Sequence, residues 1–575
     1  MTATPMRQGR SEARQLGICL AAVSAAILII WPTANWPFGD DTAYTHMALK
    51  LAETGRLTYN GWEAVVQILH TYWGALAIWL FGFSFTVVRL STIPYTLGAV
   101  AFCYLLVRRA GLRPNESVFV TLLFSLSPLF LPVAVSYMTD VPGVFFYFAS
   151  LYFLIRAGDS STGRGGYGWL ALGVVAGFLG GTGRQVVWFV PLVGLPYLAW
   201  ARRRDVRFAI VSMVGWVLTL GGVACIIWWF KQQPYTEAQL SLLREMGRAA
   251  KRPGWELNML ARFSLMLVWM CLPAALPLAR RALENTWRGT RGRKIFVGML
   301  AFAVVVAVLV HPSLASIPWV PNTLNWEGIY GSEPLPGRPI VLTRPIRAIV
   351  ALVVYFTCCL LAGELTNIRA LSSRMWDAVR NPRGSSFALT TMTLVGAVYF
   401  LTILLRSVDV DVFDRYLLPL LPWAATVLLV WFERDNAQTQ EMLAKTMPFA
   451  WALLAVFAFY AIATTQDTWA LAGARLAATQ KLEAAGIART AIDGAFDYNA
   501  WTELSISGHL NNHRVINPAG AYRPGLSQTP SIVPTYLLEY EISPKTEPTD
   551  FGSVRYFSLL PPFHKQVRID RVLSR

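Results

Sequence analysis

Three acidic residues stand where apolar segments of this sequence end or begin. Asp40 and Asp41 are adjacent and follow the first apolar run, and Asp140 precedes another, in Thr139-Asp140-Val141-Pro142. Acids placed in this way can divide the roles of general base and electrostatic stabiliser, or hold a divalent cation together. A second interpretation of Asp41 is that it caps the helix that follows, because Asp is a favoured N-cap residue. The residues themselves leave both interpretations open.

A second set of candidates is cationic. Arg415 precedes Tyr416 at the start of a later apolar run, and Arg184 stands alone between two apolar runs. A guanidinium group presents parallel N–H donors that suit phosphate oxygens. The alternative is topological, because Arg and Tyr also anchor helix ends at a membrane interface without binding a ligand.

The segment after Asp41 holds two further candidates for substrate binding, Tyr44 and His70. Tyr44 is one of several apolar positions that recur at helical spacing, which predicts an amphipathic helix lying on a membrane surface. His70 is a lone histidine, and an interfacial position explains it as well as a ligand role does. The aromatic loop 319–330 could stack on a sugar or lie at the interface. The sequence has no Walker A motif and no Rossmann glycine fingerprint, so neither ATP nor a bound dinucleotide is indicated.

The elements that position these residues are predicted by composition. Of 575 residues, 55% are hydrophobic and 14% are charged, whereas about 25% are charged in soluble domains. Runs long enough to span a bilayer need roughly 20 apolar residues. We predict a polytopic α-helical membrane protein with about thirteen spans, near 16–33, 85–107, 117–134, 140–157, 168–183, 186–201, 208–230, 261–279, 295–311, 345–363, 387–405, 416–432 and 447–464.

The distribution of Lys and Arg predicts the orientation of these spans. With the N-terminus inside, the inner connections hold 24 basic residues and the outer ones hold 12, as the positive-inside rule requires. Thirteen spans then place the C-terminus outside. The net charge of +17 is explained by this topology, so nucleic-acid binding is not expected. All the candidate site residues fall on the outer face.

The chain divides in composition near residue 464. Residues 1–464 form the predicted transmembrane domain, whose first outer loop, 34–84, carries the two adjacent acids. Residues 465–575 are more polar, with a helical pattern near 468–485 and strand patterns near 490–492, 536–541, 554–559 and 566–572. We therefore predict a small α/β domain outside the membrane.

At this point the motifs resemble those of a known group. Gly39-Asp40-Asp41-Thr42-Ala43-Tyr44 is similar to the first-loop acidic motif of the GT-C membrane glycosyltransferases, the group with protein O-mannosyltransferases, aminoarabinose transferases and Rgt-like lipopolysaccharide core transferases. Segments 79–90, 139–142 and 415–419 resemble further motifs of the group, in the same order. Together they span about residues 16–432.

The resemblance implies a sugar on polyprenyl phosphate as donor and Asp40 as general base. We expect Asp41 and Asp140 to orient the acceptor or a divalent cation, and Arg415 and Arg184 to stabilise the leaving phosphate. No cofactor is certain, and the two acids Asp41 and Asp140 are the candidate metal ligands. Some members carry Glu-Lys-Pro before the second span, where this chain has 66–73 and only His70 could replace the Lys.

The sequence therefore predicts a glycosyltransferase of the plasma (inner) membrane that acts at the outer face. Its expected partners are a polyprenyl-phosphate sugar donor, membrane lipids and a glycan, lipid or protein acceptor. Two alternatives are a transporter or flippase of lipid-linked sugars and an inert assembly subunit. Against a transporter, the acids cluster at one face and no inverted repeat is evident.

Overall fold

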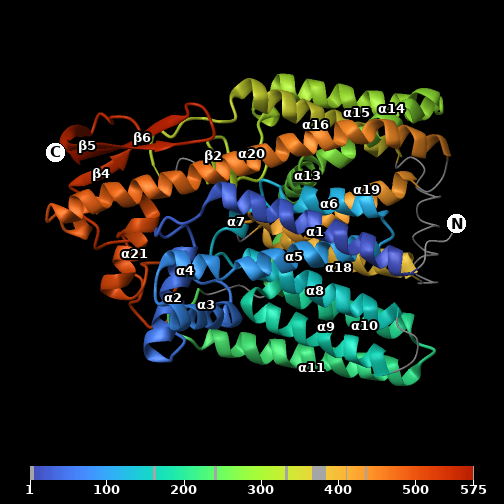
Figure 1. Cartoon of the computed structure of the whole chain (residues 1–575), viewed down its shortest axis with the longest axis horizontal. Coiled ribbons are helices and arrows are strands. Elements are labelled where there is room, and N and C mark those ends of the chain that lie inside the picture. The colour runs from blue at the N-terminus through green and yellow to red at the C-terminus, as the bar shows by residue number, and fades with distance from the viewer. Residues whose placement is uncertain are drawn as a thin grey trace.

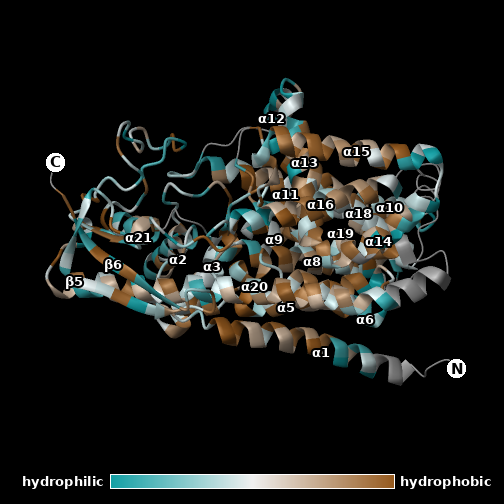
Figure 2. Ribbon diagram, turned by 90° about the horizontal axis from the view of Figure 1, so that it is seen from above, coloured by the Kyte–Doolittle hydropathy of each residue, from teal (hydrophilic) through white to brown (hydrophobic). Residues whose placement is uncertain are grey.

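The computed structural model describes residues 5–159, 164–237, 242–330, 335–364, 384–408, 411–433 and 437–573. Figure 1 shows a long bundle of helices with a small sheet at one end, next to the C-terminus. In Figure 2 the bundle is mostly hydrophobic, and hydrophilic residues gather at helix ends and around the sheet. This distribution suits a lipid environment, because charged side chains are costly within a bilayer and are rare in spanning helices.

The described residues include eight helices that are long and apolar enough to cross a membrane, or nine if one bent pair counts as a span. Only 6% of the apolar window of α15 is buried by the protein, against 72% for α8. Helix α15 therefore lies at the edge of the bundle, and α8 lies in its centre. The protein is a polytopic α-helical membrane protein, and the number of thirteen spans stays a prediction. The helices of the bundle are α1 (Pro5–Ile30), α4 (Phe85–Leu90), α5 (Ile93–Arg109), α6 (Pro114–Ser125), α7 (Phe130–Ala134), α8 (Asp140–Asp159), α9 (Arg164–Gly183), α10 (Phe189–Ala201), α11 (Val206–Lys231), α13 (Pro253–Met270), α14 (Leu272–Arg288), α15 (Arg291–Val310), α16 (Arg344–Glu364), α18 (Gly384–Arg406) and α19 (Leu421–Glu433).

Several predicted spans are interrupted, and prolines mark three of these places. The run 117–134 is divided between α6 and α7, with Pro128 in the break, and the run 261–279 bends by 80° between α13 and α14, where Pro273 follows. The run 416–432 begins as a 3₁₀ helix, η4 (Asp414–Leu420), which contains Pro419. Proline has no N–H and clashes with the preceding turn, so each interruption has a local cause.

The first outer segment differs from the surface loop that we predicted. Helix α2 (Asp41–Thr54) is buried over its first two turns instead of lying on an open surface. A second apolar helix, α3 (Ile68–Phe81), was not among the predicted elements. The reason is tertiary, because α2 packs against both α3 and a helix of the C-terminal domain, α21 (Ala495–Ser507).

The C-terminal domain contains the predicted sheet. Its four strands are β3 (Ile492–Asp493), β4 (Tyr536–Glu539), β5 (Thr546–Phe557) and β6 (His564–Val572), in the order β3-β4-β6-β5. Strand β3 is parallel to β4, and the other pairs are antiparallel. Helix α20 (Ala437–Ala484) leads from the bundle into this domain without a break, as Figure 1 shows. The predicted division at residue 464 therefore falls within one continuous helix.

Shorter elements connect these parts. A small hairpin of β1 (Leu324–Asn325) and β2 (Gly328–Ile329) lies between α15 and α16. The remaining elements are η1 (Gln185–Trp188), α12 (Leu242–Ala249), η2 (Pro312–Ala315) and η5 (Arg489–Ala491). The hairpin is the element that reaches the candidate site.

Candidate active site

Four of the predicted site residues meet at one end of the bundle. Asp40 immediately precedes α2, Asp140 is the first residue of α8, Arg184 precedes η1, and Arg415 lies in η4. Each stands at a helix boundary, where the chain leaves the apolar bundle. The meeting of two acids and two arginines depends on all four boundaries lying on the same side.

Ion pairs join these four side chains in a row. Arg415 Nη2 lies 2.7 Å from Asp40 Oδ2, and Arg415 Nε lies 3.5 Å from Asp140 Oδ2. The other oxygen of Asp140 lies 2.7 Å from Arg184 Nη2. The Asp40 side chain is 23% exposed, while those of Asp140 and Arg415 are 2% and 6% exposed. Asp40 is thus the most exposed member of the row.

Arg415 and the adjacent Asp414 are held by one further segment, residues 322–324. Its Nη1 donates to Asn322 Oδ1, beside the β1–β2 hairpin. The adjacent carboxylate of Asp414 accepts the backbone N–H groups of Thr323 and Leu324 at 3.0 and 2.7 Å. A side chain buried among such partners is not a snorkelling anchor, so the topological interpretation of Arg415 does not fit.

Arg184 and Tyr416 form the far end of the row. Arg184 Nη1 donates to the Thr139 hydroxyl at 2.7 Å, and its guanidinium lies 5.2 Å from the centre of the Tyr416 ring. The Tyr416 carbonyl accepts the hydroxyl of Tyr399 at 2.5 Å. These contacts bring both predicted residues to the same cluster as Arg415.

Asp40 is oriented by residues on both sides of it. Trp62 Nε1 donates to Asp40 Oδ1 at 3.1 Å. The preceding Gly39 has φ +55°, a conformation that favours glycine, and its N–H donates to Asp497 of α21 at 2.6 Å. The C-terminal domain therefore touches the segment that carries the candidate base.

Asp41 is not part of the row. Its carboxylate accepts the backbone N–H groups of Phe38 at 2.6 Å and Tyr137 at 3.2 Å. Burial raises the pKa of Asp41 to about 7, against the opposing effect of Arg89 and the two N–H groups. The N-cap interpretation is wrong in its position, since Asp40 is the N-cap residue and Asp41 is the first residue of α2.

His70 and Tyr44 lie beside the row, and the ring of His70 contacts those of Tyr44 and Tyr137. The ring of His70 stacks on Tyr137 with centroids 4.0 Å apart, and Tyr44 meets the same imidazole edge-on at 6.2 Å. Nε2 of His70 is 3.0 Å from the Tyr137 carbonyl, which can only accept, so this nitrogen carries the proton. A neutral, stacked imidazole is a poor substitute for the missing Lys, and its substrate-binding role stays a prediction.

A metal site at Asp41 and Asp140 also stays a prediction. Within the described ranges, no three His, Cys, Asp or Glu side chains are grouped as a cation site requires. The Asp140 carboxylate is already paired with two arginines. Two cations beside one carboxylate disfavour a further cation at that position.

Sequence reasoning missed Asn322 and Trp62, and underrated Tyr330. Asn322 and Trp62 touch Arg415 and Asp40 directly. The buried hydroxyl of Tyr330 has no hydrogen-bond partner among the residues that the structure describes, and its ring packs edge-on against Phe38 at 4.8 Å. The aromatic loop 319–330 was the only signal for this region, because no spacing rule relates an outer loop to a helix end far along the chain.

A family comparison covers part of the chain. Residues 66–229 match the family model described as dolichyl-phosphate-mannose-protein mannosyltransferase. The resemblance to GT-C membrane glycosyltransferases is confirmed. No curated protein sequence matches the chain.

Solved structures show low similarity to this chain. The S. cerevisiae protein O-mannosyltransferase Pmt1-Pmt2 complex, bound to the sugar donor, is 17% identical over 40% of this chain and 34% of its own, with a TM-score of 0.33. This chain therefore spans about a third of that relative. ArnT from Cupriavidus metallidurans, bound to undecaprenyl phosphate, is 13% identical over 81% of this chain and 79% of its own, with a TM-score of 0.36. The Archaeoglobus fulgidus oligosaccharyltransferase is 12% identical over 81% of this chain and 58% of its own, with a TM-score of 0.38.

Proposed function

We propose that this protein transfers a sugar from a polyprenyl-phosphate donor to an acceptor hydroxyl at the outer face of the plasma membrane. Asp40 takes the proton of the hydroxyl, whose oxygen then attacks the anomeric carbon. The bond from that carbon to the phosphate oxygen breaks, and the lipid phosphate leaves with the bonding electrons. A single displacement of this kind inverts the anomeric centre.

The observation that carries the proposal is the contact of Arg415 with Asp40. During the reaction Asp40 loses its negative charge to the incoming proton, and the leaving phosphate gains one. A guanidinium beside both groups can follow this movement of charge, because its fixed fork serves either oxyanion. Arg415 and Arg184 together supply two positive charges next to the buried Asp140.

The proposed donor class rests on the family match and on the position of the site relative to the membrane. The matching family is named for a dolichyl-phosphate sugar. We place the start of η4, where Arg415 is buried, at the membrane interface, which is where a lipid phosphate lies. A divalent cation, if one is used, would have to join the acids at the exposed side of Asp40, and this stays part of the proposal.

The test is sugar transfer by purified protein with a panel of polyprenyl-phosphate sugars. Asp40→Asn keeps the size of the side chain and removes its charge, so we expect transfer to fall about 100-fold or more. Asp205→Asn is a matched control, because Asp205 caps α11 away from the row. Near-normal turnover of Asp40→Asn would remove Asp40 as the base. Movement of the intact lipid-linked sugar without transfer would indicate a transporter instead.

A further inference from the structure

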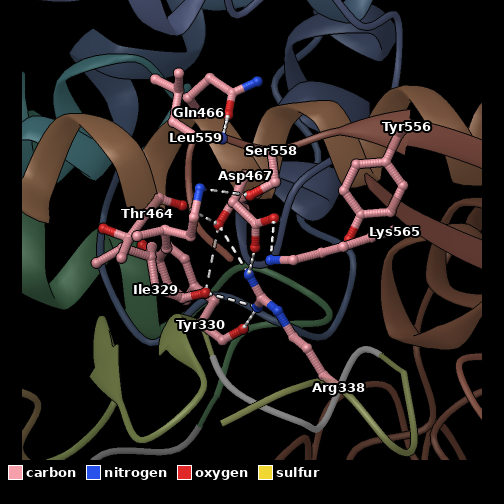
Figure 3. A network of polar contacts seen from close by, with 12 residues as sticks. Ile329, Tyr330, Arg338, Thr464, Gln466, Asp467, Tyr556, Ser558, Leu559 and Lys565 are labelled. Carbon is pink, nitrogen blue, oxygen red and sulfur yellow. Dashed lines mark hydrogen bonds and ion pairs between the residues drawn. The ribbon is translucent and has the colours of Figure 1, made fainter. Parts of the chain in front are cut away.

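A buried group of charges ties the C-terminal sheet to helix α20. Asp467 of α20 lies between Arg338 and Lys565 of β6, as Figure 3 shows. Lys565 Nζ is 2.6 Å from Asp467 Oδ1, and Arg338 Nη2 is 3.1 Å from Asp467 Oδ2. The three side chains are 2 to 3% exposed. Buried charges of this kind persist only when they are paired and hydrogen-bonded.

The sheet has a second contact at the same place on α20. Gln466 precedes Asp467, and its side chain donates to the carbonyl of Phe557 at 3.2 Å and accepts the N–H of Leu559 at 3.0 Å. Phe557 is the last residue of β5, and Leu559 lies in the connection to β6. Two consecutive residues of α20 therefore fix where the sheet sits.

Arg338 extends this group to the β1–β2 hairpin. Its Nη1 donates to the carbonyls of Ile329 at 2.8 Å and Tyr330 at 2.6 Å. Figure 3 shows both carbonyls directed at the guanidinium. One planar fork thus binds a carboxylate on one side and the hairpin on the other, which a Lys ammonium cannot reproduce.

The other side of the hairpin holds the candidate site. The N–H groups of Thr323 and Leu324 bind Asp414, and Asn322 accepts from Arg415. Tyr330 N–H closes the hairpin on the carbonyl of Thr323 at 2.9 Å. The contacts run without interruption from Lys565 in the sheet to Arg415 beside Asp40.

We propose that Arg338, held by Asp467 and Lys565, is a positioning residue that orients Arg415 through the β1–β2 hairpin. The C-terminal sheet then acts as a support for the phosphate-binding side of the site. The proposal rests on the proposed function for its consequence in donor binding, but the structural link is independent of it. Without Arg338 the buried carbonyls of Ile329 and Tyr330 lose their charged donor, and the hairpin loosens.

The experiment compares Arg338→Met and Arg338→Lys in the full-length protein. Arg568→Met is the matched control, because Arg568 lies on the same strand as Lys565 and pairs with Asp570 away from the hairpin. Hydrogen–deuterium exchange is followed in segments 322–330 and 413–418. We expect exchange to become about tenfold faster in both segments of Arg338→Met, and to stay at the wild-type rate in Arg568→Met.

Binding of undecaprenyl phosphate is then measured for the same proteins. We expect the dissociation constant to rise about tenfold in Arg338→Met, because a misplaced Arg415 loses its geometry. Arg338→Lys keeps the charge beside Asp467, so its melting temperature should return toward that of the wild type. Its exchange and its phosphate affinity should stay impaired, which a purely structural role would not produce.

Three results would overturn the proposal. They are wild-type exchange in Arg338→Met, fast exchange with unchanged phosphate affinity, and recovery of all three properties by Arg338→Lys. If the wild-type protein itself binds no polyprenyl phosphate, the proposed function fails. The exchange of segments 322–330 and 413–418 still decides in that case whether Arg338 holds the hairpin and the Arg415 segment.

Discussion

At the scale of single residues, Arg415 shows why a cation beside an acid need not be a passive partner. Each of its three guanidinium nitrogens lies against one neighbour, Asp40, Asp140 or Asn322, before any substrate arrives. Asp40 is more exposed than Asp140. A donor phosphate that displaces Asp40 from Arg415 would free that carboxylate to accept a proton.

The first residue-scale prediction concerns the geometry of this fork. Arg415→Lys keeps the charge but loses the planar fork, whose separate nitrogens reach three different neighbours. We expect donor use to fall by about tenfold or more, with Arg415→Ala worse. The measurement is the rate of transfer against donor concentration, with expression level controlled. Unchanged kinetics for Arg415→Lys would remove Arg415 from the phosphate site.

A second prediction concerns Glu63, next to Trp62 in the first outer segment. Burial raises the pKa of Glu63 to about 8, so the folded protein keeps a proton that the unfolded chain releases near its ordinary pKa. Folding stability therefore falls as pH rises from about 5 to 8. Glu63→Gln removes this dependence. Its melting temperature should therefore rise relative to that of the wild type as the pH is raised over that interval.

Thermal unfolding in detergent at several pH values tests this. Glu53→Gln is the control, since Glu53 is 49% exposed and paired with Lys50. A difference between Glu63→Gln and the wild type that stays constant from pH 5 to 8 would contradict the assignment.

At the scale of elements, helices α2 and α3 hold the acidic segment against the bundle. Gly74 allows α3 to lie close to Tyr137 and to α2. A Cβ at that position would be 2.1 Å from the Tyr137 hydroxyl and 3.0 Å from Ala48. The hydroxyl of Tyr137 cannot easily move, since it donates to the carbonyl of His70 at 2.6 Å. The N–H of Tyr137 in turn binds Asp41.

We therefore expect Gly74→Ala to destabilise the protein by about 1–3 kcal/mol, and to reduce transfer as α3 and Tyr137 separate. Gly221→Ala in α11 is the matched control, because nothing lies within 4 Å of its Cβ. Alanine there should be neutral or slightly stabilising. Equal melting temperatures for the two variants would show that α3 packs less closely than described.

At the scale of the whole molecule, the orientation in the membrane decides which substrates the site can meet. Helix α2, which Asp40 precedes, and the C-terminal sheet lie toward the same end of the bundle (Figure 1). The excess of Lys and Arg in the opposite connections predicts that this end is outside. A sugar transferase on that side would need a lipid-linked donor, because no nucleotide sugar is expected outside the membrane.

Reporter fusions test the orientation. A reporter joined after residue 575 should be exported, and one joined near Arg204 should stay in the cytoplasm. Comparable amounts of both fusion proteins in the membrane are the control for expression. Activities with the opposite sidedness would place Asp40 inside and exclude the proposed donor.

The sequence by itself determined most of the long apolar helices, because each run of apolar residues carries its own requirement for backbone hydrogen bonds in lipid. It did not predict α3. The strands of the tail followed in the same way from local alternation. The types and the shared membrane side of Asp40, Asp140, Arg184 and Arg415 were also readable, since helix ends are local features. Their roles as a site remain predictions that the contacts support.

Only the tertiary structure decided how those residues pair. Asp40 and Arg415 are 375 positions apart in the chain, and no periodicity relates two helix ends at that separation. The burial of α2, the direction of Asp41 toward backbone N–H groups and the link from Lys565 to the hairpin depend on the packing of the C-terminal domain. Packing and long-range electrostatics are properties of the assembled chain, so they could not be read from local pattern.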